Sequence, residues 1–452
     1  MTYRQKGVDF WPGPLDTTTA GTDPVRCKAY DKMWKVNRDE LEDFESSKYL
    51  NQSAGIRDWP AGRQRAVMFG NEAKYLAPYK EVTPDGVYDP FAGEHPVLDD
   101  RRPSIDNGVD KQPDMFIWWV YNDKGNIHSE TQGQPIGIEI QTTGFAFATN
   151  DEVNNMTFYS SKIINRGFTT LNDCYMGQWV DADLGNYADD YVGCDVGRSL
   201  GFCYNGDDDD ELNVGEGYGA NPPCQGLVSL SHPLKCGVVL NTGQDYFANG
   251  DYSYWLLQNS QWTDTTPWVN PLTNQVADFT LPDNPNDPNG WSEEALNDPP
   301  GDRRGMITIY EPSFRPGTAI CSDYAFLYSR VGSRLQNVQD VWNIATSIQA
   351  LYNSSEQFIC QGSSSVGLPN IKSQEKGLRI SPNPASEMLT IESQFQTPYV
   401  LAIYNAMGQV VLQKNMHGLS HESISLDALS KGYYLIQASN GQELFSEKLV
   451  VE

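Results

Sequence analysis

Short runs of β-branched and aromatic residues recur along most of the chain, and turn residues separate them. They cover residues 115–121, 136–140, 144–148, 156–165, 174–180, 253–258, 306–310 and 319–329. The chain contains 39 glycines and 27 prolines, and Asn-Gly, Asp-Gly and Pro-Asp pairs are among the breaks between the runs. Short strands bounded by such turns are typical of all-β proteins. The pattern therefore predicts an all-β fold whose body is a large β-sandwich.

Two segments have helical rather than strand-like spacing. Residues 334–352 place apolar side chains three and four positions apart, and Ser333 directly before them is a suitable N-cap. Residues 30–44 form a second, shorter candidate with apolar members such as Trp34 and Phe44. Because each stripe covers only one face, we expect one or two peripheral helices that pack against the sandwich.

A change in composition near residue 361 separates the C-terminal part of the chain. Residues 361–377 are first rich in small residues and then in charges, without periodicity, which indicates a linker. Seven short alternating runs follow within residues 378–452, a pattern typical of a small β-sandwich of the immunoglobulin type. We therefore expect an N-terminal segment at 1–50, a β-rich body at 51–360, this linker, and a C-terminal domain at 378–452.

Four motifs in the C-terminal domain occur in one order. They are Ile-Ser-Pro-Asn-Pro-Ala at 380–385, Ile-Tyr-Asn-Ala-Met-Gly-Gln-Val-Val at 403–411, the stretch 426–436 with Leu-Ser-Lys-Gly-Tyr-Tyr, and Glu-Lys-Leu-Val-Val at 447–451. Together they resemble the type A C-terminal sorting domain of Bacteroidetes type IX secretion cargo. The resemblance implies the type IX secretion machinery as a partner and a location at the cell surface or in the medium. It also implies an export signal, which residues 1–10 lack, so we expect the natural chain to begin earlier.

The body carries a second, looser resemblance. Its blocks include Trp-Trp-Val-Tyr-Asn-Asp at 118–123, Asp-Asp-Tyr-Val-Gly-Cys-Asp at 189–195, Tyr-Asn-Gly-Asp at 204–207 and Pro-Gly-Asp-Arg-Arg at 300–304. These blocks are similar to a module of large secreted Bacteroidetes surface proteins. The module brings no activity with it, so any function has to be inferred from the residues themselves.

The charge balance excludes two classes of partner. The chain has 32 basic and 59 acidic residues, a formal net charge of -27. A polyanion of this size repels nucleic acid phosphates and anionic lipid. Apolar runs have strand length, well short of the roughly 18 residues that a membrane-spanning helix needs. We therefore expect no nucleic acid partner and no membrane insertion.

The excess of negative charge is concentrated between residues 181 and 216, where 11 acidic residues accompany a single arginine. Carboxylates at alternate positions before a glycine turn supply the oxygen ligands that Ca²⁺ prefers. The candidate ligands are Asp181, Asp183, Asp189, Asp190 and Asp195. The spacing departs from that of an EF-hand loop, and a solvated acidic loop is an equal alternative. Ca²⁺ is the cofactor that the sequence suggests.

Eight cysteines are present, and none forms a Cys-x-x-Cys pair, so a zinc ribbon or a thioredoxin-like centre has no support. Five of them crowd around the acidic loops, namely Cys174, Cys194, Cys203, Cys224 and Cys236. In an exported protein, disulfides that staple these loops are expected.

Sequence signatures of catalysis are missing: the chain has no Gly-x-Ser-x-Gly, His-Glu-x-x-His or Walker A motif. Paired carboxylates carry no information, because with 59 acidic residues some pair always has the required separation. The aromatic segment 252–255 is either a stacking platform for sugars or part of the core. Our first hypothesis is a non-catalytic, structural or adhesive surface protein stabilised by Ca²⁺. The alternatives are a carbohydrate-binding or glycan-active protein and a self-associating subunit of an extracellular polymer.

Overall fold

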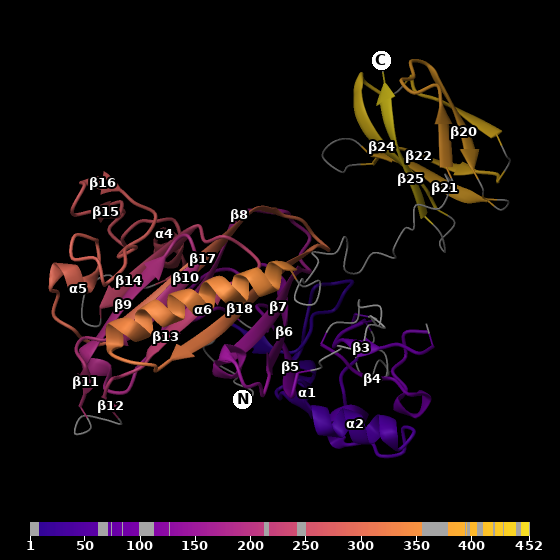
Figure 1. The fold of residues 1–452 in the computed structure, drawn as a ribbon. Coiled ribbons are helices and arrows are strands. Elements are labelled where there is room, and N and C mark those ends of the chain that lie inside the picture. The colour runs from indigo at the N-terminus through magenta and orange to yellow at the C-terminus, as the bar shows by residue number, and fades with distance from the viewer. Residues whose placement is uncertain are drawn as a thin grey trace. The chain divides into compact units, whose positions relative to one another are not determined.

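A computed structural model describes residues 9–61, 71–98, 113–211, 217–241, 250–354 and 378–451, apart from residues 74, 84, 126, 394, 396–397, 405–409, 419–420, 428 and 440–443. The chain forms two compact units, Met1–Gly367 and Leu368–Glu452 (Figure 1). The expected linker at 361–377 lies outside the described residues. We call the first unit the body and the second the C-terminal unit.

The body is built on a nine-stranded antiparallel sheet. Its order is β1-β5-β6-β7-β18-β13-β10-β9, and β2 also pairs with β5. The strands are β1 (Trp11–Pro12), β2 (Trp34–Asn37), β5 (Met115–Asn122), β6 (Ile138–Ala146), β7 (Met156–Asn165), β9 (Asp190–Asp195), β10 (Leu200–Asn205), β13 (Cys224–Ser229) and β18 (Ala319–Ser329). Because β1 and β2 belong to this sheet, residues 9–50 are part of the body and not a separate segment.

A second sheet lies against one face of the large sheet. It has the order β14-β17-β8, with β14 at Cys236–Asn241, β17 at Arg303–Phe314 and β8 at Leu171–Asp181. Phe314 of this sheet packs on Ile138 and Ile320 of the large sheet in one apolar cluster. The two sheets confirm the prediction of an all-β sandwich.

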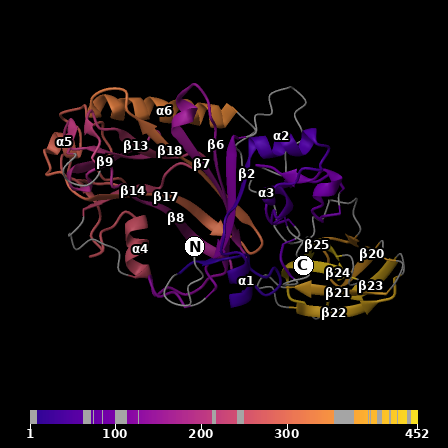
Figure 2. The same ribbon diagram turned by 90° about the horizontal axis from the view of Figure 1, so that it is seen from below.

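The opposite face of the large sheet is covered by α6 (Arg334–Ser354), which lies along β13 and β18 (Figure 1). Its stripe of Val338, Val341, Ala345 and Ile348 is buried in the main core. At Gly226 of β13 a Cβ atom would lie 2.8 Å from Val341, so the close approach of the helix requires glycine there. The predicted helix is confirmed, and Figure 2 shows the succession of α6, large sheet, small sheet and the short helix α4.

Two elements differ from prediction. The helix expected at 30–44 begins only at Arg38, because Trp34–Asn37 pairs with β5 as β2 and Asn37 then caps α2 (Arg38–Ser46). The strand expected at 253–258 is the helix α4 (Asp251–Gln258), in which the adjacent Leu256 and Leu257 are both buried. The other helices are α1 (Pro24–Ala29), α3 (Ala54–Arg57) and α5 (Glu293–Leu296), with single-turn 3₁₀ helices η2 (Pro90–Ala92), η3 (Glu152–Asn155) and η4 (Tyr187–Asp189).

Three two-stranded hairpins complete the described part of the body. They are β3 (Tyr79–Lys80) with β4 (His95–Pro96), β11 (Asp209–Asp210) with β12 (Gly219–Ala220), and β15 (Val269–Asn270) with β16 (Gln275–Val276). Of these, β11 contributes two residues of the acidic region, Asp209 and Asp210.

The predicted disulfide staples are wrong for the cysteines around the acidic loops. All five are free thiols, as is Cys27. The five belong to different strands. Cys224 of β13 lies opposite Tyr204 of β10, so these two side chains are on the same face of the large sheet. Cys203, the residue before Tyr204, points to the other face and therefore away from Cys224. Cys321 is disulfide-bonded, and Cys360 lies outside the described residues.

The C-terminal unit is a small sandwich of two sheets, as predicted. Their orders are β19-β20-β23 and β22-β21-β24-β25. The strands are β19 (Leu378–Ser381), β20 (Met388–Ser393), β21 (Tyr399–Tyr404), β22 (Val410–Met416), β23 (His421–Ser425), β24 (Gly432–Ser439) and β25 (Leu444–Val451). Leu389, Ile391, Leu401, Ile403 and Ile436 are fully buried between them. In neither unit does the described chain contain a helix that is long and apolar enough to span a membrane.

Candidate functional site: acidic loops and an exposed aromatic surface

The five predicted Ca²⁺ ligands do not converge on one point. Asp195 is held within its own turn, where Arg198 Nη1 lies 2.5 Å from Oδ2 and the Arg198 backbone N–H donates to Oδ1 over 3.0 Å. Asp181 is exposed, and Arg304 Nε lies 3.1 Å from its Oδ2. These two carboxylates therefore have arginine partners.

Among the described residues, one group of three carboxylates has its oxygens within 4.8 Å of one another: Asp181, Asp183 and Asp302. Asp181 and Asp183 are exposed. Arg304 contacts Asp302 as well as Asp181, with Nη1 2.6 Å from Asp302 Oδ1. A guanidinium thus already neutralises part of this group, as is common for exposed acidic residues.

Asp189 and Asp190 differ from the other three predicted residues, because they are withdrawn from solvent at the start of β9. Asp190 is 1% exposed, and its Oδ2 accepts a hydrogen bond of 3.0 Å from the Leu184 backbone N–H. Its Oδ1 and both carboxylate oxygens of the half-buried Asp189 are buried and accept no hydrogen bond of ordinary geometry within the described chain. The Cys203 thiol is a neighbour of Asp190, and the Asn205 side chain is a neighbour of Asp189. Within the described chain, neither of them belongs to a group of three carboxylates with oxygens within 4.8 Å of one another.

Neighbouring acidic groups add to the cost of burying this pair. Asp210 is fully buried and accepts backbone N–H groups from Asn186 (2.9 Å) and Tyr218 (2.7 Å). Burial raises the pKa of Asp190 to about 8, and the nearby carboxylates of Asp189 and Asp210 act in the same direction. Burial also raises the pKa of Asp189 to about 7, and so does its contact with the Glu211 carboxyl group.

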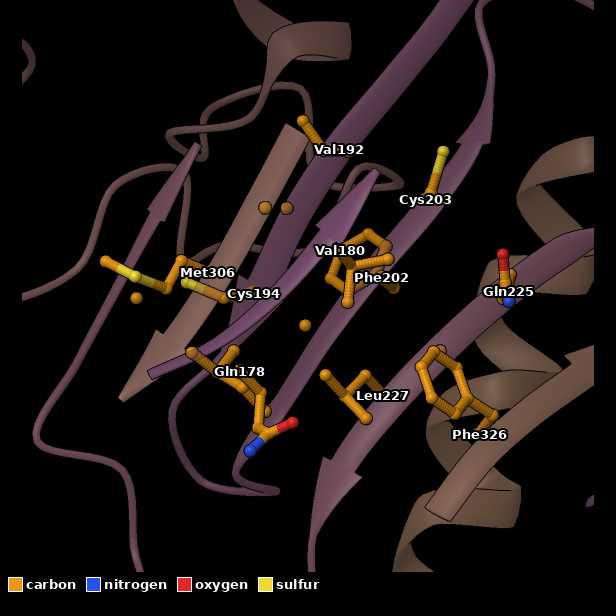
Figure 3. Close-up of a pocket in the computed structure, with 16 residues that line it drawn as sticks. Gln178, Val180, Val192, Cys194, Phe202, Cys203, Gln225, Leu227, Met306 and Phe326 are labelled. Carbon is orange, nitrogen blue, oxygen red and sulfur yellow. The ribbon is translucent and has the colours of Figure 1, made fainter. Parts of the chain in front are cut away.

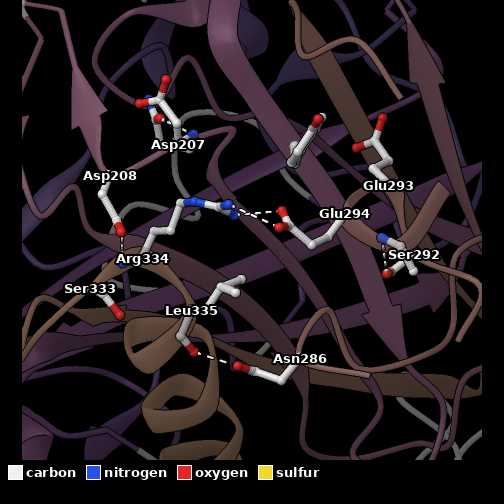
Figure 4. Close-up of polar contacts among 12 residues, drawn as sticks. Asp207, Asp208, Asn286, Ser292, Glu293, Glu294, Ser333, Arg334 and Leu335 are labelled. Atoms are coloured by element: carbon white, nitrogen blue, oxygen red, sulfur yellow. Dashed lines mark hydrogen bonds and ion pairs between the residues drawn. The ribbon is translucent and has the colours of Figure 1, made fainter. Parts of the chain in front are cut away.

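The consecutive acids at 207–211 have separate roles, and Figure 4 shows the surroundings of Asp207 and Asp208. Asp208 accepts the backbone N–H of Arg334 over 2.9 Å at the start of α6. The Arg334 guanidinium binds Glu294 through two contacts of 2.7 and 3.0 Å. An acid at the N-terminus of a helix is favourable. Asp208 therefore ties the acidic run to the first residue of α6, while Glu294 of α5 binds the side chain of the same residue.

An apolar cavity lies between the two sheets of the body. Its lining includes Val180, Cys194, Phe202, Leu227 and Phe326 (Figure 3), and its volume of about 40 Å³ suffices for one to a few water molecules. The 16 residues that line it include no histidine, carboxylate, lysine or arginine. Burial raises the pKa of the Cys194 thiol far above its usual range. The cavity therefore offers no group for acid-base or nucleophilic chemistry at neutral pH.

The outer face of the small sheet carries exposed aromatic rings. On α4, Tyr252 and Trp255 are 60% and 42% exposed, and their rings stack with centroids 6.0 Å apart and planes 12° apart. Trp255 meets Tyr175 of β8 edge-on at 6.5 Å, and Tyr175 contacts Tyr310 of β17 at 5.1 Å. We call these four residues the aromatic surface. Trp179, 40% exposed, continues the row along the same face of β8.

Local sequence explains how this surface is held. Tyr252 and Trp255 are three positions apart on a helix and so share a face, while Leu256 and Leu257 anchor the helix in the body. Gly177 of β8 admits α4, because a Cβ atom there would lie 2.7 Å from Gln258 Nε2. The sequence drew attention to residues 252–255, but it gave no signal for Tyr175 and Tyr310, whose contact with the helix is long-range.

Polar groups border the aromatic rings. The Tyr175 hydroxyl donates to Asn259 Oδ1 over 2.9 Å, and the Tyr310 hydroxyl donates to Asp173 Oδ1 over 2.6 Å. The hydrogen bond to Asp173 raises the pKa of Tyr310 to about 12. The surface thus combines exposed ring faces with hydrogen-bonding groups at its edge.

Comparisons with known proteins identify the C-terminal unit. Residues 379–452 match the family model described as the secretion system C-terminal sorting domain. A search of curated proteins finds no match for the chain.

Solved structures are similar to the chain only remotely. They include a polysaccharide lyase, with a TM-score of 0.20 and 9% identity over 70% of this chain and 34% of that chain. A β-glucuronidase from Ruminococcus gnavus has a TM-score of 0.14 and 10% identity over 68% of this chain and 38% of that chain. The chain therefore spans less than half the length of either protein, and similarities this low bear on neither fold nor function.

The C-terminal unit thus has both the sequence motifs and the seven-stranded sandwich expected of a sorting signal. Such a signal is recognised by the secretion machinery and directs the protein that carries it out of the cell. The chain is therefore a cargo protein of the type IX secretion system, exported to the cell surface or the medium.

Proposed function

We propose that the body is a non-catalytic, adhesive protein of the cell surface that binds neutral glycans through the aromatic surface. The observation that carries the proposal is the exposure of the stacked pair Tyr252 and Trp255, which have no core-forming role at 60% and 42% exposure. Exposed apolar patches with a polar rim are characteristic of interaction sites.

The chemistry of the surface favours a sugar. The electron-rich faces of aromatic rings attract the partly positive C–H groups on one side of a pyranose ring. At the rim, Asp173 and Asn259 supply oxygen atoms that accept hydrogen bonds from sugar hydroxyl groups. The net charge of -27 opposes binding of anionic polysaccharides, so the proposal commits to neutral ones.

A non-catalytic role is supported by the contacts of the three histidines of the body. His95 Nδ1 lies 3.0 Å from the Gly93 carbonyl oxygen, and His128 Nε2 lies 2.6 Å from the Asp123 carbonyl oxygen. His232 Nδ1 lies 2.8 Å from the hydroxyl of its neighbour Ser231. Each imidazole is therefore engaged in a short-range contact with a structural role.

Affinity electrophoresis of the full chain tests the proposal. Native gels would contain dextran, mannan or xylan as neutral polysaccharides and alginate as the anionic control. Retardation by at least one neutral polysaccharide and none by alginate is expected. A Tyr252→Ala/Trp255→Ala variant should lose the retardation, whereas Tyr254→Ala, on another face of the same helix, should keep it.

Two outcomes would contradict the proposal. One is the same mobility in all gels for the wild-type chain. The other is release of reducing sugar ends when the chain is incubated with the polysaccharide that retards it, because that would make the protein an enzyme.

A further inference from the structure

The small sheet of the body ends in a long strand that has a neighbour on only one side. β8 pairs with β17 in one constant register along Leu171–Asp181. Among the residues that the structure describes, no backbone hydrogen bond joins β8 to any other segment. Every second residue of an antiparallel strand points its N–H and C=O away from a given neighbour, so β8 presents a row of these groups along its free edge. Figure 1 shows β8 along one border of the body.

The other edges of the two sheets are covered or short. At β14, the Gly237 N–H donates to the Asp278 carbonyl oxygen over 3.3 Å, and the Gly237 carbonyl oxygen accepts the Thr280 N–H over 3.0 Å. At β9, the Cys194 N–H donates to the Leu281 carbonyl oxygen over 3.1 Å. At the opposite end of the large sheet, β1 is two residues long and ends in proline. Within the described part of the body, β8 is therefore a long edge that no other segment covers.

β8 also lacks the features that keep an edge strand from pairing with another chain. Proteins usually protect such an edge with lysine, proline or a bulge. The sequence Leu-Asn-Asp-Cys-Tyr-Met-Gly-Gln-Trp-Val-Asp contains no lysine, arginine or proline, and its pairing with β17 shows no bulge. At 11 residues, β8 is about twice as long as a typical strand. A strand of this kind is suited to accept a further strand.

We propose that two copies of the chain join through β8, which pairs antiparallel with β8 of the second copy and merges the two small sheets into one. The contact is isologous, so it closes after two copies and gives a dimer rather than a polymer. It does not depend on glycan binding. The two-fold axis is perpendicular to the joined sheet, so the aromatic surfaces of both copies lie on the same face of the dimer.

The charges along β8 favour full overlap of the two strands. With Met176 on the two-fold axis, Asp173 of one copy lies opposite Trp179 of the other, and Asp181 lies opposite Leu171. No two acidic residues then face each other, whereas an axis at the next residue would set Asp173 against Asp181. Like charges directly opposite are destabilising. Charges farther apart than about 8 Å are largely screened at physiological ionic strength, so the residues that face each other decide the register.

Sedimentation equilibrium of the full chain tests the dimer. With increasing protein concentration at physiological ionic strength, the mass should rise from that of one chain to that of two and no further. Hydrogen–deuterium exchange on the same samples locates the contact without a substitution. Amides of β8 should exchange more slowly as the dimer forms, whereas those of α6, on the other side of the large sheet, should be unchanged.

Two substitutions at Trp179, whose side chain is 40% exposed, test the register. Both remove the same ring, so any effect of its loss on folding is common to them. Trp179→Asp sets a carboxylate opposite Asp173 in both halves of the interface, whereas Trp179→Lys sets an ammonium group there. Because facing like charges repel and facing opposite charges attract, the Kd of the dimer should be about tenfold or more higher for Trp179→Asp than for Trp179→Lys.

Four results would contradict this assignment. A chain that stays monomeric at every concentration would show that β8 does not pair with itself. A dimer whose β8 amides exchange as fast as those of the monomer would place the contact elsewhere. Equal Kd values for the two variants would refute the register, and growth beyond two copies would refute the closed two-fold contact.

Discussion

Glu139 of β6 and Arg166, directly after β7, form a buried ion pair that also contacts the N-terminal residues, and its removal should be costly. Glu139 and Arg166 have side chains that are 0% and 3% exposed, with Arg166 Nη2 3.0 Å from Glu139 Oε1. The carboxylate also accepts hydrogen bonds from the Leu15 backbone N–H (2.8 Å), from Gln141 Nε2 (2.7 Å) and from Arg166 Nε (3.2 Å). Four donors thus converge on one buried carboxylate.

Glu139→Gln preserves the shape but removes the negative charge that faces the buried Arg166 guanidinium. It also replaces one of the two accepting oxygens of Glu139 with an NH₂ group, which then faces N–H donors of Leu15, Gln141 or Arg166. Breaking one partner of a buried pair costs about 3–5 kcal/mol. At about 2–4 °C per kcal/mol, the Tm of the body should fall by roughly 6–20 °C.

Thermal and urea unfolding followed by tryptophan fluorescence measures this loss. The matched control is Asp58→Asn, which removes an exposed ion pair: Arg57 Nε lies 3.4 Å from Asp58 Oδ1, and the side chains are 58% and 40% exposed. The control should cost at most about 1 kcal/mol. If both variants lose the same small amount, the reasoning about burial is refuted.

Two further predictions concern packing and pH. Ile348→Ala in α6, at a side chain 3% exposed, should lower the free energy of unfolding by about 2–5 kcal/mol in urea titrations, and an effect under about 1 kcal/mol would mean that α6 is not part of the core. Burial lowers the pKa of His95, and the positive charge of Lys80 lowers it further. The hydrogen bond with the Gly93 backbone and the negative charge of Glu45 offset part of this decrease. Because the folded state then favours the neutral ring, stability from this group is complete above pH 6.5 and declines as the pH falls below it. A His95→Asn variant should show a flatter Tm between pH 7.5 and 5.5 than the wild type, and an equal slope would contradict the prediction.

Local patterns were sufficient for most of the fold. Alternation over 115–121 and 156–165 predicts strands because one face of each is buried, and the three-four spacing of 334–352 predicts α6 because that helix packs on a sheet. The C-terminal sandwich was predicted for the same reason. Its seven runs are short, and each alternates.

The errors come from contacts that no local pattern reveals. Tyr252, Tyr254 and Trp255 favour strands by propensity, but the burial of Leu256 and Leu257 makes the segment a helix. Asp181, Asp190 and Asp195 fit the same sequence pattern for Ca²⁺ ligands, but their surroundings differ. Asp181 contacts Arg304 of β17, a residue remote in sequence, whereas Asp190 is buried.

The same reason explains why the sequence indicates only the helical half of the aromatic surface, Tyr252 and Trp255. Tyr175 and Tyr310 come from β8 and β17, and their rings meet because these strands pair in a register that sets Tyr310 opposite Tyr175. Long-range register places side chains beside one another, and sequence spacing does not report it.

Isothermal titration calorimetry tests the central claim most directly. The full chain and its Trp255→Ala variant would each be titrated with oligosaccharides of the neutral polysaccharide that retards the wild-type chain. Removal of a central aromatic anchor costs about 2 kcal/mol or more, so the account predicts a Kd at least about tenfold higher for the variant. Equal Kd values for the two proteins would contradict it, because the sugar would then bind away from the aromatic surface.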